Sequence, residues 1–207
     1  MRITKHLRRR AAIWATAGLA VAAVASALSL TTASAAPVTS ARTSGPFTFR
    51  LVPSPNIKSC LPHAGGNVTI TPGKQNDKMK VWIHGMPKNA EFDLFVIQQP
   101  NKPFGVSWYQ TDVNANSNGV GFASVRGIFD RETFSVSPGG TTTFAPTHQF
   151  HLGLWFNDPQ LPFKLGCEPG QAAPVVTPFN GEQHAGIQVL NTAEFPDNAG
   201  PLSHVHR

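Results

Sequence analysis

The chain has few of the features that most readily identify an enzyme. It contains two cysteines and one tyrosine, only 14% of its residues are charged, and no Gly-x-Ser-x-Gly sequence is present. Without that nucleophile elbow, and without a cysteine that stands apart as reactive, nucleophilic catalysis is not indicated. The 11 acidic residues can be paired in many ways. No motif singles out two of them as the carboxylate pair of a glycoside hydrolase.

Long apolar runs are also scarce, and the one that exists lies at the start. Five basic residues before position 11 precede an Ala/Val/Leu-rich stretch that ends near Leu30, and Ala33-Ser34-Ala35 offers small residues for cleavage. This is the pattern of a secretory signal peptide. We therefore expect residues 1–35 to be removed near Ala35 and the mature protein to be secreted. An uncleaved anchor is the alternative, and the arginines at 8–10 leave general and twin-arginine export both open.

Removal of that segment changes the charge balance. The chain has 17 Lys/Arg and 11 Asp/Glu, and 17 − 5 = 12 basic residues remain after position 35, which leaves a net charge of 12 − 11 = +1. No run of basic residues survives, so nucleic-acid binding is not expected. No later stretch approaches the roughly 20 apolar residues of a spanning helix. We therefore expect no membrane span after cleavage.

The remaining chain is of a length typical of one domain. Residues 36–46 are small and polar with two prolines and are predicted to be flexible, and residues 47–207 are predicted to form a single domain. Cys60 and Cys167 lack the C-x-x-C spacing of redox or metal pairs. In a secreted protein, such a pair typically forms a disulfide. Closing a loop of 167 − 60 = 107 residues stabilises the fold by about 4–5 kcal/mol in the chain-entropy model.

Helical periodicity is missing after residue 36, where the prolines and glycines would interrupt helices repeatedly. Short runs of β-branched and aromatic residues recur between turn residues instead. This pattern predicts an all-β fold, an antiparallel β-sandwich of the immunoglobulin or fibronectin type with one disulfide. The predicted strands are Phe47–Val52, Asn67–Thr71, Lys78–His84, Glu91–Gln98, Val106–Gln110, Val120–Phe129, Thr133–Val136, Gln149–Phe156 and Gly186–Asn191.

Alternation of apolar and polar residues assigns faces to two of these strands. In Lys78–His84, the apolar row Met79, Val81 and Ile83 should face the core, which turns Trp82 to the other side with two lysines and a histidine. In the strand that ends at Phe156, one row is Phe150, Leu152, Leu154 and Phe156, and the other is His151, Gly153 and Trp155.

Two loops resemble known motifs. Gly85-Met86-Pro87 followed by Phe92 resembles the proline-containing corner of fibronectin-type sandwiches, with Phe92 in place of the tyrosine that locks it. Asp112-Val-Asn114-Ala-Asn116-Ser-Asn118-Gly119 resembles a calcium loop, but it offers one carboxylate and no glutamate near its twelfth position. A hairpin with Asn118-Gly119 at the tight turn is favoured over a calcium site.

Aromatic side chains are the strongest candidates for a binding surface. Large amphipathic rings stack on sugars and gather at interfaces, although rings packed against a core are the structural alternative. The candidates are Trp82, Trp108, Tyr109 and Trp155. The loop that begins at Thr177 adds Asn180, Glu182 and His184, an amide, an acid and an imidazole within five residues. His148 and His151 are three apart and would point to opposite sides of a strand. We expect no metal site and no cofactor; a tertiary cluster of His84 with His184 stays open.

Five strings of the chain together resemble a group of uncharacterised exported bacterial proteins. They are Phe92-Asp-Leu-Phe-Val96, Pro103-Phe-Gly-Val-Ser-Trp-Tyr-Gln110, His151-Leu-Gly-Leu-Trp-Phe-Asn157, Thr177-Pro-Phe-Asn-Gly181 and Ala185-Gly-Ile-Gln-Val-Leu-Asn-Thr192. The resemblance implies export and one unit from Cys60 to Leu202, and it implies no activity.

The sequence therefore predicts a secreted, non-enzymatic protein that binds a glycan or protein of the cell envelope or the medium through surface aromatics. A small hydrolase that uses Glu182 and His184 is the first alternative. An exported protein with a purely structural role is the second. The oligomeric state is left open.

Overall fold

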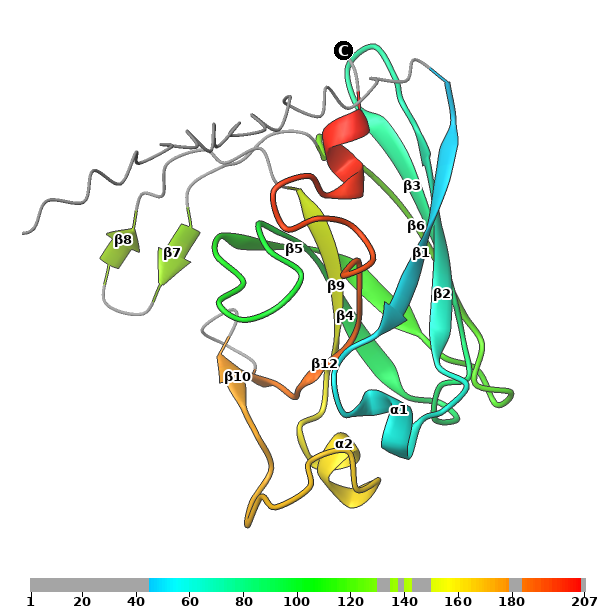
Figure 1. The fold of residues 1–207 in the computed structure, drawn as a ribbon. Coiled ribbons are helices and arrows are strands. Elements are labelled where there is room, and N and C mark those ends of the chain that lie inside the picture. Colours follow the sequence, from blue (N-terminus) through cyan, green and yellow to red (C-terminus); the bar gives the residue numbers. More distant parts are fainter. Residues whose placement is uncertain (1–44, 130–134, 138–139, 143–149, 179–183, 206–207) are drawn as a thin grey trace, which may run out of the picture. The chain divides into compact units, whose positions relative to one another are not determined.

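The computed structural model describes residues 45–129, 135–137, 140–142, 150–178 and 184–205 (Figure 1). Residues 1–35 and most of the segment 36–46 lie outside the described residues, as do Asn180 and Glu182. Eight strands form one antiparallel sheet in the order β5-β4-β9-β12-β1-β2-β3-β6. They are β1 (Phe47–Pro53), β2 (Gly65–Thr71), β3 (Asp77–His84), β4 (Glu91–Ile97), β5 (Ser107–Asn114), β6 (Gly121–Gly127), β9 (His151–Phe156) and β12 (Gln188–Asn191).

Shorter elements complete the described chain. Two small strand pairs stand outside the large sheet: β7 (Ser135–Ser137) with β8 (Gly140–Thr142), and β10 (Thr177–Pro178) with β11 (His184–Ala185). The helices are α1 (Ile57–Cys60), α2 (Gln160–Lys164) and the 3₁₀ helix η1 (Pro201–His204). Among the described residues, no helix has the length and apolar character that crossing a membrane requires.

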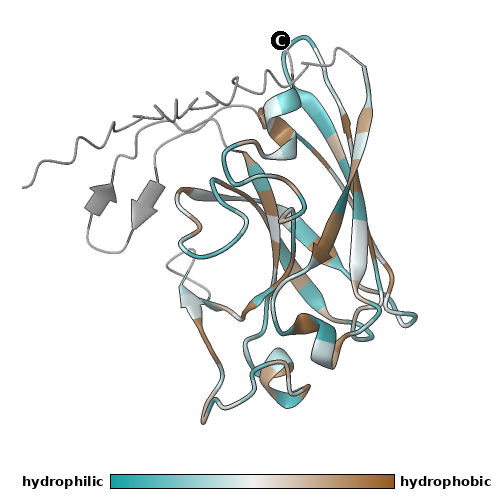
Figure 2. Ribbon diagram, viewed as in Figure 1, coloured by the Kyte–Doolittle hydropathy of each residue, from teal (hydrophilic) through white to brown (hydrophobic). Residues whose placement is uncertain are grey.

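The burial of side chains along β3 alternates with a period of two residues, as its sequence predicts. Met79, Val81 and Ile83 are fully buried, whereas Lys80 and Trp82 between them are exposed. Figure 2 shows hydrophobic and hydrophilic residues interspersed along the strands in this way. Because successive side chains of a strand point to opposite faces, the apolar rows turn inward together and form the core.

The large sheet curls on itself because one strand joins its two halves. The first five residues of β1 pair with β2, and its last two residues, Val52 and Pro53, pair with β12. The end strands β5 and β6 meet at the Ala115–Gly121 bridge, so the sheet is nearly closed and barrel-like. The predicted antiparallel all-β architecture is confirmed. The immunoglobulin or fibronectin sandwich is not confirmed, because all eight strands belong to one continuous sheet.

The turn between β5 and β6 is the predicted hairpin turn. Gly119 has a φ of 71°, whereas Asn118 does not have positive φ. The Oδ1 atom of Asn116 accepts hydrogen bonds from the backbone N–H groups of Asn118 (2.8 Å) and Val120 (3.2 Å). The amide thus closes the turn, and beyond it the two strands diverge to opposite partners, β5 to β4 and β6 to β3.

Strand β9 is buried on both faces. The predicted apolar row of Leu152, Leu154 and Phe156 is fully buried in the main core, and Phe92, the residue of the corner motif, packs there on Phe156 with 5.2 Å between ring centroids. Trp155 on the second face is also fully buried, in a smaller cluster outside the barrel. Its partners are Phe95, Ile97, Ala185 and the half-buried Phe104.

The predicted disulfide is present between Cys60 and Cys167, with 5.1 Å between their Cα atoms. It ties the end of α1 to the segment that follows α2, across 107 residues of sequence. Neither helix exceeds five residues. Helices this short are not stable by themselves, so the bond fixes a region that regular structure does not hold.

Candidate functional site

One outer face of the barrel combines exposed rings with basic and hydroxyl side chains. Strand register places twelve outward-pointing side chains of β1, β2, β3 and β6 in cross-strand rows, and we call this surface the cationic face. The first row is Arg50, Asn67, Trp82 and Phe122; the second is Thr48, Thr69, Lys80 and Ser124; the third is Thr71, Lys78 and Arg126; His84 lies beyond Trp82 opposite Gly65.

Two aromatic residues form the β3 and β6 end of the first row. Trp82 is 42% exposed and Phe122 is 60% exposed, and they are direct partners across β3 and β6. The His84 ring lies 5.1 Å from the Trp82 ring, centroid to centroid. Cross-strand partners stand about 4.5–5.5 Å apart at their Cβ atoms, so these rings make one continuous patch. Large exposed aromatic residues at neighbouring positions are typical of a binding surface.

The charge on the cationic face is of one sign. Arg50, Lys78, Lys80 and Arg126 contribute four positive charges, and none of the twelve residues is acidic, so the sum is 4 − 0 = +4. The mature chain as a whole is predicted to carry only +1. Surface potentials of one sign attract ligands of the opposite sign.

Hydroxyl and amide groups fill the remaining positions of the cationic face. The Oγ1 atoms of Thr48 and Thr69 lie 3.0 Å apart in a hydrogen bond across β1 and β2. Asn67, between Arg50 and Trp82, is exposed. This set of groups can stack on a ring, pair with an anion and exchange hydrogen bonds with hydroxyls.

The other predicted aromatic residues lie elsewhere, so the three indoles do not converge. Trp108 on β5 is half-buried and packs edge-on against Phe150 of the core. Tyr109, its neighbour, is 49% exposed on the opposite side of β5. Trp155 is fully buried and lines a cavity of about 460 Å³.

The predicted polar loop is described only at its edge. His184 is exposed on β11, opposite Pro178, and Asn180 and Glu182 lie outside the described residues. Across the described part of the chain, no three His, Cys, Asp or Glu side chains gather as metal ligands would.

An acidic pair that the sequence did not single out lies on the outer surface of β4 and β5. Asp93 and Asp112 are cross-strand partners. The Tyr109 hydroxyl donates to Asp112 Oδ1 at 2.7 Å, and Asn157 Nδ2 donates to Asp93 Oδ1 at 3.2 Å. Burial, the nearby charges of Asp112 and Glu91, and a hydrogen bond with Asp112 raise the pKa of Asp93 to about 6, although the Asn157 bond opposes them.

The same pair affects the tyrosine. Partial burial of the hydroxyl, together with the Asp112 carboxylate that it donates to, raises the pKa of Tyr109 to about 12. A carboxylic acid with a raised pKa beside an ionised one is an arrangement that enzymes use for proton transfer. Asp93 and Asp112 line neither the cavity at Trp155 nor the one at Arg50 and Glu194.

Comparison with known proteins does not add to these observations. No protein-family model matches the chain, and no curated protein is significantly similar to it. The interpretation of the site therefore rests on its geometry and its charge.

Proposed function

We propose that this is a secreted, non-enzymatic protein that binds an anionic polysaccharide of the cell envelope or of the surrounding medium through the cationic face. The observation that carries the proposal is the exposed Trp82–Phe122 pair among four basic side chains with no acidic residue in the same rows. The location follows from the predicted signal peptide at residues 1–35.

Each part of the cationic face suits this ligand class. The carbon-bound hydrogens of a sugar ring pack on aromatic faces, which Trp82 and Phe122 present to solvent. Arg50 and the two lysines of β3 stand within the same rows, where they can pair with the carboxylate or phosphate groups of a polymer. A sheet face has no walls, so it suits an extended chain better than a small molecule, which binds in concave sites.

The hydrolase alternative stays a prediction. It requires Glu182, which lies outside the described residues, and His184. If a panel of extracellular substrates reveals turnover, Glu182→Gln should abolish it, and retention of turnover in that variant would exclude the predicted role of Glu182.

Binding should be measured by sedimentation of the purified protein with polygalacturonate, with its methyl ester as the neutral counterpart and with an isolated bacterial wall preparation. We expect binding to polygalacturonate that weakens as salt rises, because ion pairs at an exposed surface are screened. The methyl ester should bind at least about 10-fold more weakly, since a tenfold change corresponds to about 1.4 kcal/mol.

Matched variants distinguish the contribution of the aromatic rings to binding from that of the basic side chains. Trp82→Ala and Phe122→Ala should each weaken binding about 10-fold or more, whereas Tyr109→Ala removes a similarly exposed ring of β5, outside the rows, and should leave binding unchanged. Lys80→Glu should abolish binding, and Lys88→Glu, an exposed lysine outside the rows, should reduce it little. Equal effects of Trp82→Ala and Tyr109→Ala, or no retention on any anionic polymer, would overturn the proposal.

A further inference from the structure

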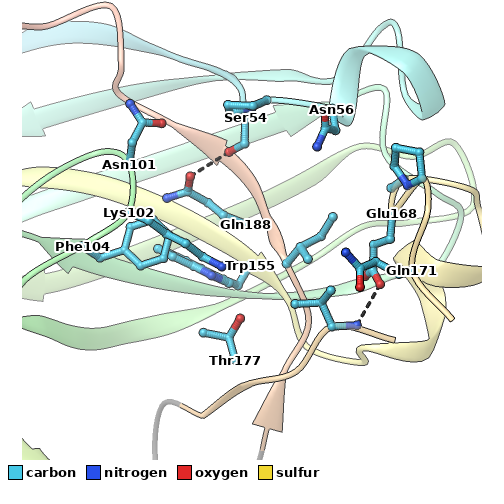
Figure 3. A pocket seen from close by; sticks show the side chains of 15 residues that line it. Ser54, Asn56, Asn101, Lys102, Phe104, Trp155, Glu168, Gln171, Thr177 and Gln188 are labelled. Carbon is cyan, nitrogen blue, oxygen red and sulfur yellow. Dashed lines mark hydrogen bonds between the residues drawn. The ribbon is translucent and has the colours of Figure 1, made fainter. Parts of the chain in front are cut away.

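A cavity on the outer side of β9 and β12 is lined by two side chains that each have a buried polar atom without a hydrogen-bond partner among the described residues. Its volume is about 460 Å³, within the range of small-molecule sites. Segments distant in the sequence form its walls: the turn after β1, the loop between β4 and β5, β9, the chain after Cys167, and β12. Figure 3 shows the side chains that line it. None of them belongs to the cationic face.

The first unpaired atom is Nε2 of Gln188, a side chain that is only 8% exposed. Asn191 determines which way this amide points. The Asn191 Oδ1 atom accepts from the Ala193 N–H at 3.0 Å, so its Nδ2 group must be the donor toward Gln188 Oε1 at 2.9 Å. Ser54 Oγ donates to the same Gln188 oxygen at 2.8 Å. The oxygen of Gln188 is therefore occupied, and its N–H₂ group has no partner among the described residues.

The second unpaired atom is Oε1 of Glu168, which is 7% exposed. The other carboxylate oxygen accepts the Val175 N–H at 2.8 Å. The carboxylate is held rigidly, because the preceding residue, Cys167, is fixed by the disulfide and the Glu168 carbonyl accepts from Gln171 N–H at 3.2 Å. A buried carboxylate is unfavourable unless donors surround it, and the described residues supply none to Oε1.

Basic and aromatic groups lie toward the Gln188 end. Lys102 and Phe104 belong to one loop, which the Gln99 N–H to Phe104 carbonyl bond closes at 3.0 Å. The Phe104 and Trp155 rings meet edge to face at 5.0 Å. A Cβ built on Gly153 would overlap the Trp155 ring and lie 2.8 Å from Gln188 Nε2, so the ring and the amide pack over the same point of β9.

The two ends of the cavity are therefore opposite in character. Figure 3 shows Glu168 set apart from Gln188 across the cavity, with Phe104 and Trp155 on the Gln188 side. Within the described part of the chain, the carboxylate oxygen at one end lacks a donor and the amide N–H₂ at the other end lacks an acceptor; the Lys102 ammonium stands at the exposed rim beside that amide. A ligand that satisfies both ends has a cation at one terminus, an anion at the other and an apolar body between them.

We propose that the cavity binds a short peptide in its zwitterionic form, with the α-ammonium group on Glu168 and the terminal carboxylate at Gln188 and Lys102. A dipeptide separates its two charges by about two residues of chain, roughly 7 Å when extended. An apolar side chain at its second position would pack on Phe104 and Trp155. The ligand ammonium would supply the donor that Oε1 of Glu168 lacks among the described residues.

Isothermal titration of the purified protein with glycyl-phenylalanine and alanyl-leucine tests the proposal. We expect saturable binding of at least one dipeptide. N-acetylation should weaken it at least 10-fold by removing the ammonium, and C-terminal amidation should weaken it by removing the carboxylate. N-acetylglucosamine and glucose test a neutral sugar in the same cavity. Preference for a sugar, or equal binding of the acetylated peptide, would overturn the proposal.

Variants connect the binding to the two unpaired atoms. Glu168→Gln should weaken dipeptide binding at least 10-fold, and N-acetylation should then cause little further loss, because both changes remove the same ion pair. Gln188→Glu places an anion where the carboxylate of the dipeptide would bind, and it should abolish binding. Glu194→Gln, a matched change of an exposed acid at the other cavity, should leave the affinity unchanged.

Stability measurements exclude a misfolded variant. Glu168→Gln should unfold at the same temperature as the wild type or higher, because it removes a buried charge with one oxygen that has no donor among the described residues. Wild-type affinity in a folded Glu168→Gln protein, or no heat with any dipeptide, would show that the cavity does not bind this class. These outcomes are independent of binding at the cationic face, which Trp82→Ala reports.

Discussion

Replacement of Asp93 by asparagine tests the electrostatics of the outer surface of β4 and β5. Asp93 is half-buried opposite Asp112, and burial is the main cause that raises its pKa from 3.8 to about 6. The ionised form is therefore disfavoured in the folded protein. Asparagine has the same shape, cannot ionise, and retains the oxygen that accepts from Asn157 Nδ2.

The size of the effect follows from the pKa. A difference of 6 − 3.8 = 2.2 in pKa corresponds to about 3 kcal/mol at 1.36 kcal/mol for each pKa unit. Asp93 is partly exposed, and solvent screens its interactions, so we expect about 1–2 kcal/mol. Below pH 3.8 the side chain is protonated in both states and contributes nothing. Between pH 3.8 and 6 the unfolded state loses the proton first, so the wild type loses stability as pH rises, and above pH 6 the loss is complete.

Urea unfolding of the wild type and Asp93→Asn from pH 3.5 to 8 measures this directly. The two proteins should be equally stable at the acid end, and the variant should gain about 1–2 kcal/mol between pH 4 and 6 and keep that gain to pH 8. Carboxylates that do not interact with Asp93 change both proteins alike and cancel in the difference. Glu194→Gln, at an exposed acid, should differ little from the wild type throughout. A destabilised Asp93→Asn protein at pH 8, or a difference that does not change with pH, would refute the reasoning.

Three further predictions concern the fold. Reduction of the Cys60–Cys167 bond should lower the free energy of unfolding by about 4–5 kcal/mol, and an unchanged denaturation midpoint in reductant would contradict this. Leu154→Ala should cost about 2–5 kcal/mol in urea unfolding, because Leu154 is fully buried; Leu165→Ala, at a 38% exposed position, is the control. Burial lowers the pKa of His151 below its usual 6.5, so the wild type should lose stability as pH falls through 6.5. This loss of unfolding free energy at low pH should be absent in His151→Gln and retained in His184→Gln. If it persists in His151→Gln, His151 is not its source.

The surroundings of His151 explain why it is neutral. The ring is fully buried, with Nδ1 2.9 Å from the Thr192 hydroxyl and Nε2 3.2 Å from the Asp197 carbonyl. The carbonyl can only accept, so Nε2 carries the proton. Nδ1 then accepts from Thr192, which in turn accepts from the Leu152 N–H at 3.1 Å. Both ring nitrogens are satisfied without a charge, which is how a core holds a histidine.

Several elements were predictable because their signals are local. The alternation in β3 correctly assigned Met79 and Val81 to the core and Trp82 to the surface. Asn118-Gly119 marked the turn between β5 and β6, although Asn116, and not Asn118, closes it through its side chain. The apolar row of a strand and the residues of a tight turn lie within a few consecutive positions, so short stretches of sequence suffice to predict them.

The candidate sites were less predictable, because they depend on which strands become neighbours. Trp82 was singled out from the sequence, but Phe122 was not, and only the register of β3 with β6 makes them partners. Nothing in the sequence connected Glu168 with Gln188. The sequence of a strand does not show whether a loop distant in the chain folds over it, so the walls of a cavity cannot be recognised from sequence.

The amino-acid order alone determined that this chain forms short antiparallel strands, that β3 has one apolar row, and that its two cysteines pair, because period-two alternation and cysteine count need no knowledge of distant residues. Tertiary structure alone decided that the strands curl into one nearly closed sheet, that Trp155 is covered on the outside of β9, and that Glu168 and Gln188 line one cavity. Those features arise from strand register and from loops that fold back over the sheet, and both are set by packing between residues far apart in the chain.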